Sequence, residues 1–174
     1  MPNVAELFIF GLTAGLALAI PVGPMALLLI DTTLRFGLRV GAAGALAMAS
    51  VDATYAVVVF LAGSAVASIL GTYGIWFSLI GAAILLGLGA QTVYKALSQR
   101  RASEGSSGAQ VEATTAGKTY LKFAAATVVN PPTALYFVAI TPSLVGLTGS
   151  DPVSATFAFA SGVFLGSVVW QQGL

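Results

Sequence analysis

The stretch Leu7–Ile30, LFIFGLTAGLALAIPVGPMALLLI, contains no charged residue and is bounded by Glu6 and Asp31. A helix that crosses a bilayer needs about 20 mainly apolar residues, because the hydrocarbon core is about 30 Å thick. The stretch meets that requirement, and it is longer than the apolar segment of about 7–15 residues found in cleaved signal peptides. No basic residue precedes it. We therefore interpret it as a transmembrane helix of the mature protein.

The composition of the whole chain also indicates a lipid environment. Of its 174 residues, 57% are hydrophobic and 7% are charged, whereas soluble domains carry about 25% charged residues. A net charge of +1 excludes the basic surface that nucleic-acid binding needs. Neither Cys nor His occurs, which excludes thiolate metal sites and removes the commonest transition-metal ligand. We expect a lipid bilayer as partner, and no nucleic acid, bound metal or cofactor.

Charged residues divide the remaining chain into apolar intervals that locate further helices. The interval from Val40 to Tyr94 contains one charge, Asp52, and is long enough for two crossings. We predict an all-α membrane protein with five transmembrane helices. They are expected near residues 4–30, 40–62, 72–97, 119–145 and 152–174.

All basic residues lie in two of the predicted connections. Arg35 and Arg39 occupy the first connection, and the other five lie in or beside the third: Lys95, Arg100, Arg101, Lys118 and Lys122. Cytoplasmic loops of membrane proteins carry an excess of Lys and Arg. We therefore predict a multi-pass protein of the plasma membrane, with its N-terminus outside and the loops around 31–39 and 98–118 in the cytoplasm.

The chain contains a weak internal repeat. An aromatic residue, Phe10 or Tyr120, is followed eleven positions later by a proline-containing break. The breaks read Pro21-Val22-Gly23-Pro24 and Asn130-Pro131-Pro132. Three helices per half would invert the second half, a plan typical of transporters. We predict a first half at 1–97, a flexible cytoplasmic linker at 98–118 and a second half at 119–174, which lacks the last helix of a six-helix 3+3 inverted repeat. A lipid-binding role for the linker is weaker, because its basic residues are dispersed.

The two breaks are candidates for a substrate site. A proline within a helix lacks an N–H and leaves the carbonyl four residues earlier without its helical donor. Such breaks normally face protein or a water-filled cavity. There, free carbonyls can accept hydrogen bonds from an ammonium group, and free N–H groups can bind a carboxylate. This chemistry suits a zwitterion such as an amino acid, although prolines in membrane helices often only kink them. The predicted substrate-binding residues are Pro21, Gly23, Pro24, Asp52, Asn130, Pro131 and Pro132.

Asp52 is the second candidate. It lies thirteen residues after Arg39, about 20 Å along a helix and near the middle of the bilayer. A carboxylate there is costly unless it is paired or hydrated, and we expect Asp52 to stand alone among polar residues at this depth. We predict that it binds a substrate amine or carries a coupled proton. A protonated Asp hydrogen-bonded to a neighbouring helix is the alternative. Asp31 and Arg35 are gate candidates, although an ordinary ion pair four residues apart also explains them.

Three pairs of glycines predict close helix packing. Gly11 and Gly15, Gly37 and Gly41, and Gly162 and Gly166 are each four residues apart. Residues four apart lie on one face of a helix, and small residues there let two membrane helices approach closely.

Taken in order, several segments resemble the lysine/threonine exporter family, LysE/RhtB. The most specific is Pro21-Val22-Gly23-Pro24, which is similar to the family's Pro-Gly-Pro signature with Val22 inserted. The other segments are Arg35-Phe36-Gly37-Leu38-Arg39-Val40-Gly41, Asp52 after small residues, Gly81 to Tyr94, and Asn130-Pro131-Pro132. The resemblance runs through essentially the whole chain. It implies efflux of amino acids or related metabolites driven by the proton gradient, six helices and a capacity to form homodimers.

These observations together predict a secondary transporter that exports amino acids or related small metabolites, by proton antiport through Asp52. Export of an inorganic cation is an alternative, although a single carboxylate provides too few ligands to bind a hard cation well. A non-transporting membrane scaffold is another, and it would tolerate replacement of Asp52 and of the prolines. We expect no enzyme activity, because no intramembrane acid is accompanied by a base or a metal site.

Overall fold

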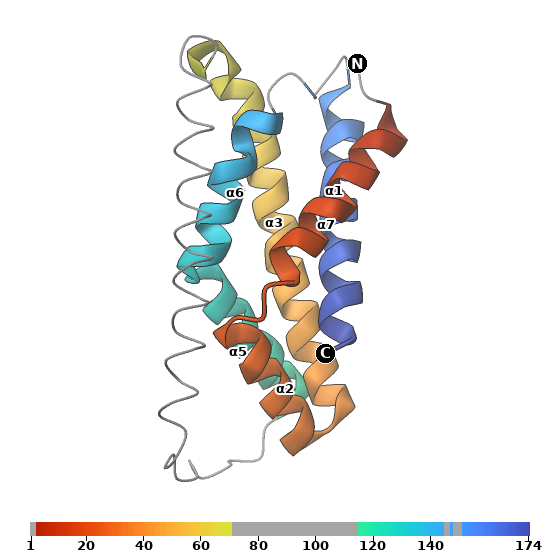
Figure 1. The fold of residues 1–174 in the computed structure, drawn as a ribbon, viewed down its shortest axis with the longest axis vertical. Coiled ribbons are helices and arrows are strands. Elements are labelled where there is room, and N and C mark those ends of the chain that lie inside the picture. The colour runs from red at the N-terminus through yellow and green to blue at the C-terminus, as the bar shows by residue number, and fades with distance from the viewer. Residues whose placement is uncertain (1–2, 71–114, 145–146, 148–150) are drawn as a thin grey trace.

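The computed structural model describes residues 3–70, 115–144, 147 and 151–174, and nearly all of those residues are helical. The predicted span 72–97 and nearly all of the linker 98–118 lie outside the described residues. Figure 1 shows the arrangement. The helices are α1 (Val4–Ala19), α2 (Pro24–Phe36), α3 (Leu38–Leu70), α5 (Ala116–Val128), α6 (Pro131–Leu144) and α7 (Pro152–Gln172).

The described helices confirm an all-α membrane protein. Leu38–Ala62 of α3 and Pro152–Gln172 of α7 are long and apolar enough to cross a bilayer, as predicted for 40–62 and 152–174. The predicted spans 4–30 and 119–145 are each a bent pair. α1 and α2 meet at 80°, and α5 and α6 meet at 54°. With each pair counted as one span, the described residues make up to four crossings.

Local sequence accounts for where the helices begin and turn. Asn3 Oδ1 accepts the Glu6 N–H at 2.8 Å, and Glu6 Oε2 accepts the Asn3 N–H at 3.0 Å, so a capping box starts α1. Pro24 is the first residue of α2, where its missing N–H costs nothing. Gly37, with φ of 87°, makes the tight turn into α3. α2 continues to Phe36, beyond the predicted end at residue 30.

Glycines bring α1 and α7 into backbone contact. A Cβ on Gly11 or Gly15 would collide with the backbone carbonyl of Phe159 or Val163. The reverse also holds, because a Cβ on Gly162 or Gly166 would collide with the carbonyl of Phe8 or Leu12. The predicted close packing of these two pairs is confirmed.

The third glycine pair behaves differently from the prediction. Gly41 packs against the Thr33 side chain of α2, as a small residue in a close contact should. No atom lies within 4 Å of the position that a Cβ on Gly37 would take. The prediction was therefore wrong for Gly37, which serves the α2–α3 turn instead of a helix contact.

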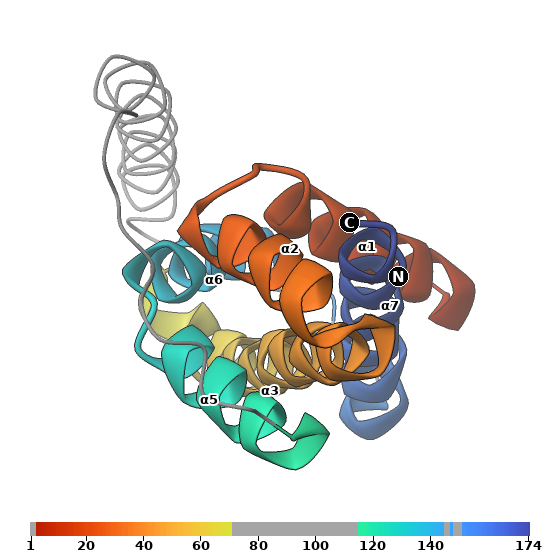
Figure 2. The same cartoon turned by 90° about the horizontal axis from the view of Figure 1, so that it is seen from below.

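α3 is the central helix of the described bundle, with α2, α5, α6 and α7 packed around it (Figure 2). The rings of Phe60 and Phe159 stack with centroids 5.4 Å apart and join α3 to α7. Leu29 of α2 and Phe123 of α5 are buried against Met48. Because lipid is as apolar as these side chains, close packing and hydrogen bonds hold membrane helices together.

The two bent pairs run in opposite directions along the long axis, and both breaks lie near its middle (Figure 1). The N-terminus and the start of α7 lie at the upper end of the view, whereas the α2–α3 turn and the start of α5 lie at the lower end. Arg35, Arg39, Lys118 and Lys122 belong to the segments at the lower end. The positive charges of the described helices therefore gather at one end of the bundle.

Candidate functional site

Asp52 lies in the centre of the bundle and is hydrogen-bonded to α7. Its side chain is 2% exposed. Ser167, which is fully buried, donates its hydroxyl to Asp52 Oδ2 at 2.5 Å. Gln171 donates from Nε2 to Ser167 Oγ at 2.7 Å, and the same nitrogen is 3.5 Å from Asp52 Oδ2. The expectation that Asp52 stands alone among polar residues was therefore wrong. We call Asp52, Ser167 and Gln171 the acid cluster.

The sequence contains one indication of this cluster, a pair of polar residues in α7. Ser167 and Gln171 are four residues apart in an otherwise apolar helix, so they share one face. Val163 continues that face one turn earlier and is also fully buried. A polar pair on the buried face of a membrane helix indicates a partner on another helix. The identity of the partner could not be read, because Asp52 precedes Ser167 by 115 residues.

Tyr136 joins α6 to α1 through a hydrogen bond. Its hydroxyl donates a 2.8 Å hydrogen bond to the carbonyl of Ala14. The phenol also lies close enough to Asp52 to interact with its charge. Phe137 follows Tyr136, and the two rings meet edge to face with centroids 5.6 Å apart. Tyr136 was not predicted as a site residue, since a lone tyrosine in an apolar stretch is equally typical of a packed core.

The first break leaves N–H groups free at the start of α2. α1 ends with the N–H of Ile20 donating to Leu16 at 2.9 Å. The first N–H bond inside α2 runs from Leu27 to the carbonyl of Gly23 at 3.2 Å. Gly23 has no side chain to cap the helix, so the N–H groups of Met25 and Ala26 have no capping acceptor. A carboxylate is the group that such an end accepts best.

The second break has its carbonyls occupied. The carbonyl of Val128 cannot receive an N–H from Pro132, and it accepts the hydroxyl of Tyr55 at 2.8 Å. The carbonyl of Thr127, four residues before Pro131, accepts the backbone N–H of Asn130 at 3.1 Å. The amide of Asn130 donates to Thr133 Oγ1 at 3.1 Å. The prolines thus leave these two carbonyls without their helical donors, as predicted, and Tyr55 and Asn130 supply other donors.

The structure does not join all the predicted site residues into one cluster. Among the described residues, the hydrogen bonds of Asp52 run to α7 and to neither break. The four prolines of the two breaks are exposed on the described bundle. Within the same residues no group of three or more acidic side chains lies close enough to hold a metal ion. Pro21, Gly23, Pro24, Asn130, Pro131 and Pro132 therefore lie in two separate breaks, with Asp52 in a third place.

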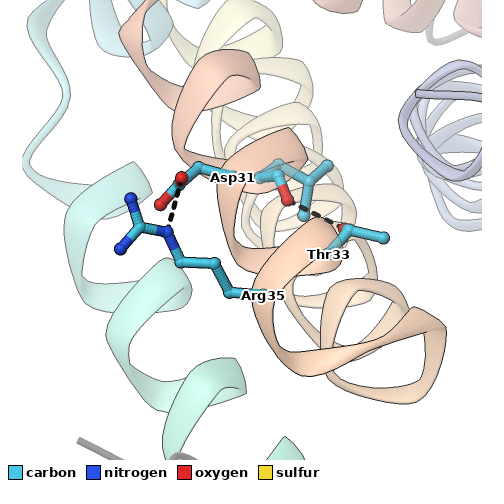
Figure 3. A network of polar contacts seen from close by, with 4 residues as sticks. Asp31, Thr33 and Arg35 are labelled. Carbon is cyan, nitrogen blue, oxygen red and sulfur yellow. Dashed lines mark hydrogen bonds and ion pairs between the residues drawn. The ribbon is translucent and has the colours of Figure 1, made fainter. Parts of the chain in front are cut away.

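The gate candidates form the ion pair that their spacing predicts. Arg35 Nε donates to Asp31 Oδ1 at 2.7 Å, and the side chains are 44% and 51% exposed. Figure 3 shows the pair on one side of α2, with Thr33 on the other, where its hydroxyl donates to the Leu29 carbonyl at 2.8 Å. Among the described helices, α2 alone takes part in this ion pair, so its role as a gate remains a prediction.

The comparisons with known proteins give one family. The profile of the LysE type translocator family matches residues 16–174. No match was found among curated proteins or among solved structures. The matched range includes both breaks, the acid cluster, the last turn of α1 and the whole of α2, α3, α5, α6 and α7. The chain therefore belongs to the LysE type translocator family, a family of membrane transporters.

Proposed function

We propose that this protein is a secondary exporter that moves amino acids or related small metabolites out of the cytoplasm in exchange for protons. The observation that carries the proposal is the buried carboxyl of Asp52, held by α7 in the middle of a membrane bundle. Ionisable groups at that depth are costly to keep, and they commonly mark proton or substrate pathways. Family membership supports export of this class of compound.

The substrate would bind at the two breaks. The uncapped N–H groups of Met25 and Ala26 suit the carboxylate of an amino acid. The carbonyl of Val128, now bonded to Tyr55, is an acceptor that an ammonium group can take over. The opposite directions of the two bent pairs support an inverted repeat, in which one half moves against the other to alternate access.

The end of the bundle that carries Arg35, Arg39, Lys118 and Lys122 would face the cytoplasm. The N-terminus would then lie outside the plasma membrane. Asp31 and Arg35 would form a gate at the cytoplasmic end, where their ion pair is accessible to an arriving zwitterion. The family resemblance of the sequence also leads us to expect a homodimer.

Efflux from proteoliposomes tests the proposal. Vesicles loaded with labelled amino acids are given a proton gradient, and the initial efflux rates of wild type and Asp52→Asn are compared. We expect gradient-driven efflux in the wild type and a loss of at least about tenfold in Asp52→Asn. Asp151→Asn is the matched control, because Asp151 is an exposed helix cap. It should transport as the wild type does.

Three other results would redirect the proposal. Efflux that is unchanged in Asp52→Asn would remove this carboxyl from proton coupling. Transport of an inorganic cation with no amino acid transported would favour the cation exporter. Absence of transport for every solute tried, with no effect of replacing Asp52 or the prolines on the function measured in cells, would favour a scaffold.

A further inference from the structure

We infer that Ser167 and Gln171 are positioning residues for Asp52, and that the Gln171 amide turns over when Asp52 takes up a proton. The inference rests on the proposed function only for its biological role, since the hydrogen-bond chain itself is a property of the bundle. It explains why the buried face of α7 carries a glutamine at this point.

The hydrogen bonds of the acid cluster point in one direction. Gln171 Nε2 donates to Ser167 Oγ at 2.7 Å, and Ser167 donates to Asp52 Oδ2 at 2.5 Å. A carboxylate accepts hydrogen bonds and donates none. The observed direction is therefore the one that stabilises ionised Asp52, and hydrogen bonds in such a chain strengthen one another.

When Asp52 is protonated, the hydrogen bonds between Asp52, Ser167 and Gln171 must run in the opposite direction. A protonated carboxyl donates one hydrogen bond, and Ser167 Oγ, at 2.5 Å from Oδ2, is the oxygen placed to accept it. The hydroxyl proton of Ser167 must then point away from Asp52, toward Gln171. In the observed orientation it would meet Nε2, which is a donor and cannot accept.

Gln171 carries the missing acceptor on the same side chain. Its Oε1 is buried and has no hydrogen-bond partner among the residues that the structure describes, and the residue is only 5% exposed. A half-turn of the amide places Oε1 near Ser167, and the chain then runs from Asp52 through Ser167 to Gln171. One proton has joined Asp52, the two hydrogen bonds of the chain have reversed direction, and the 3.5 Å hydrogen bond from Gln171 Nε2 to Asp52 Oδ2 is given up. A buried amide whose oxygen has no partner in one state can accept a hydrogen bond in the other. This is what alternation between ionised and protonated Asp52 requires.

Few other titratable or charged groups of the described helices lie near the hydrogen bonds of the acid cluster. Within the described part of the chain, Tyr136 of α6 is the titratable side chain that interacts with the charge of Asp52. The α7 face contributes only Ser167 and Gln171, which do not titrate. The charged side chains of α2 and α5 are exposed: Asp31, Arg35, Lys118 and Lys122.

Isotope-edited infrared spectroscopy of the protein in lipid bilayers tests the inference. The chain has three aspartates, Asp31, Asp52 and Asp151, so ¹³C-aspartate labelling identifies the carboxyl band that Asp52→Asn removes. Labelled glutamine reports the side-chain amide. On acidification we expect the Asp52 acid band to appear together with a change in one glutamine amide. That amide change should be absent in Asp52→Asn and in Gln171→Leu.

Gln172 is the matched control for Gln171. Its amide donates to the carbonyl of Ala42 at 3.3 Å instead of joining the acid cluster. Gln172→Leu should keep the paired change of carboxyl and amide. Ser167→Ala should move the carboxyl band to higher frequency, because the acid loses its acceptor, and Ser167→Thr should restore it.

The decisive outcomes do not require a folded variant of Ser167 or Gln171. If acidification of the wild type protonates Asp52 while every glutamine amide stays constant, the inference is wrong. It is also wrong if no Asp52 acid band appears before the protein unfolds. A paired change of carboxyl and amide, with normal efflux by Asp52→Asn, would keep the inference and remove the proposed function. Loss of efflux in Asp52→Asn, without any amide change on acidification of the wild type, would keep the proposed function and remove the inference.

Discussion

The hydroxyl of Tyr55 donates to the carbonyl of Val128 at 2.8 Å, in the position where a helix would use the N–H of residue 132. That residue is a proline, so the backbone itself cannot supply the donor. Tyr55 lies on α3, and its ring also stacks on Phe137 with centroids 5.5 Å apart. One side chain of the central helix thus compensates for the break between α5 and α6.

This relationship predicts a dependence between Tyr55 and Pro132. Tyr55→Phe keeps the ring and removes the hydroxyl, which should destabilise the protein by about 0.6–1.7 kcal/mol, the range for hydrogen bonds between membrane helices. In a Pro132→Ala background, the new N–H can serve the Val128 carbonyl. There Tyr55→Phe should cost much less. Unfolding of the four proteins in detergent gives the coupling energy, and an equal cost in both backgrounds would contradict the interpretation.

The contact of α1 with α7 predicts a second set of effects. Gly162→Ala and Gly15→Ala each place a methyl group against a backbone carbonyl of the other helix. Since neither backbone can yield without separating the helices, each substitution should destabilise the protein by about 1–3 kcal/mol. Thermal unfolding in detergent measures the change.

Gly117 is the control for these substitutions. It lies in the first turn of α5, and no atom lies within 4 Å of an added Cβ. Gly117→Ala should leave the stability within about 1 kcal/mol of the wild type, and any change should be favourable because alanine suits a helix better. Equal losses at Gly117 and Gly162 would mean that the helix contact is not the cause.

The sequence predicts those features whose cause lies within one helix. Charges locate the spans, prolines locate the breaks, and glycines four apart locate the α1–α7 contact. The end of α2 was predicted too early, at residue 30, because the apolar stretch ends there. The helix continues through Asp31 and Arg35, whose ion pair stabilises helical structure beyond the apolar stretch. The roles of Ser167 and Tyr136 were missed for another reason, since each depends on a partner more than a hundred residues away.

The ion pair between Asp31 and Arg35 makes the gate testable. Because both side chains are about half exposed, Arg35→Gln should change the stability by no more than about 0.5 kcal/mol. A gate would nevertheless show a changed efflux rate in Arg35→Gln, with recovery in the charge-swapped pair Asp31→Arg with Arg35→Asp. Unchanged stability together with an unchanged efflux rate would leave the pair as a helix-stabilising contact alone.

The absence of cysteine from the chain makes its orientation easy to measure. Single cysteines introduced by Asn3→Cys and Leu38→Cys place a thiol near each end of the bundle, and both positions are exposed. We expect a membrane-impermeant thiol reagent to label Asn3→Cys in intact cells. Leu38→Cys should react only after the membrane is permeabilised, because the arginines beside it favour the cytoplasmic side. The opposite pattern would invert the proposed topology.

Asp151 predicts how α7 responds to acid. Its carboxylate accepts the Ser154 hydroxyl at 2.5 Å and the Ser154 N–H at 3.2 Å. These hydrogen bonds hold the pKa of Asp151 below its usual value of 3.8. The contribution of this cap to stability is therefore complete above the unfolded pKa, and it is lost as the pH falls through the folded pKa. Asp151→Asn, which can cap the helix without ionising, should remove that part of the acid dependence. Thermal unfolding of both proteins from neutral to acidic pH tests this: the advantage of the wild type over Asp151→Asn should shrink as the pH falls. A difference between the two proteins that does not change with pH would mean that the charge of Asp151 does not stabilise α7.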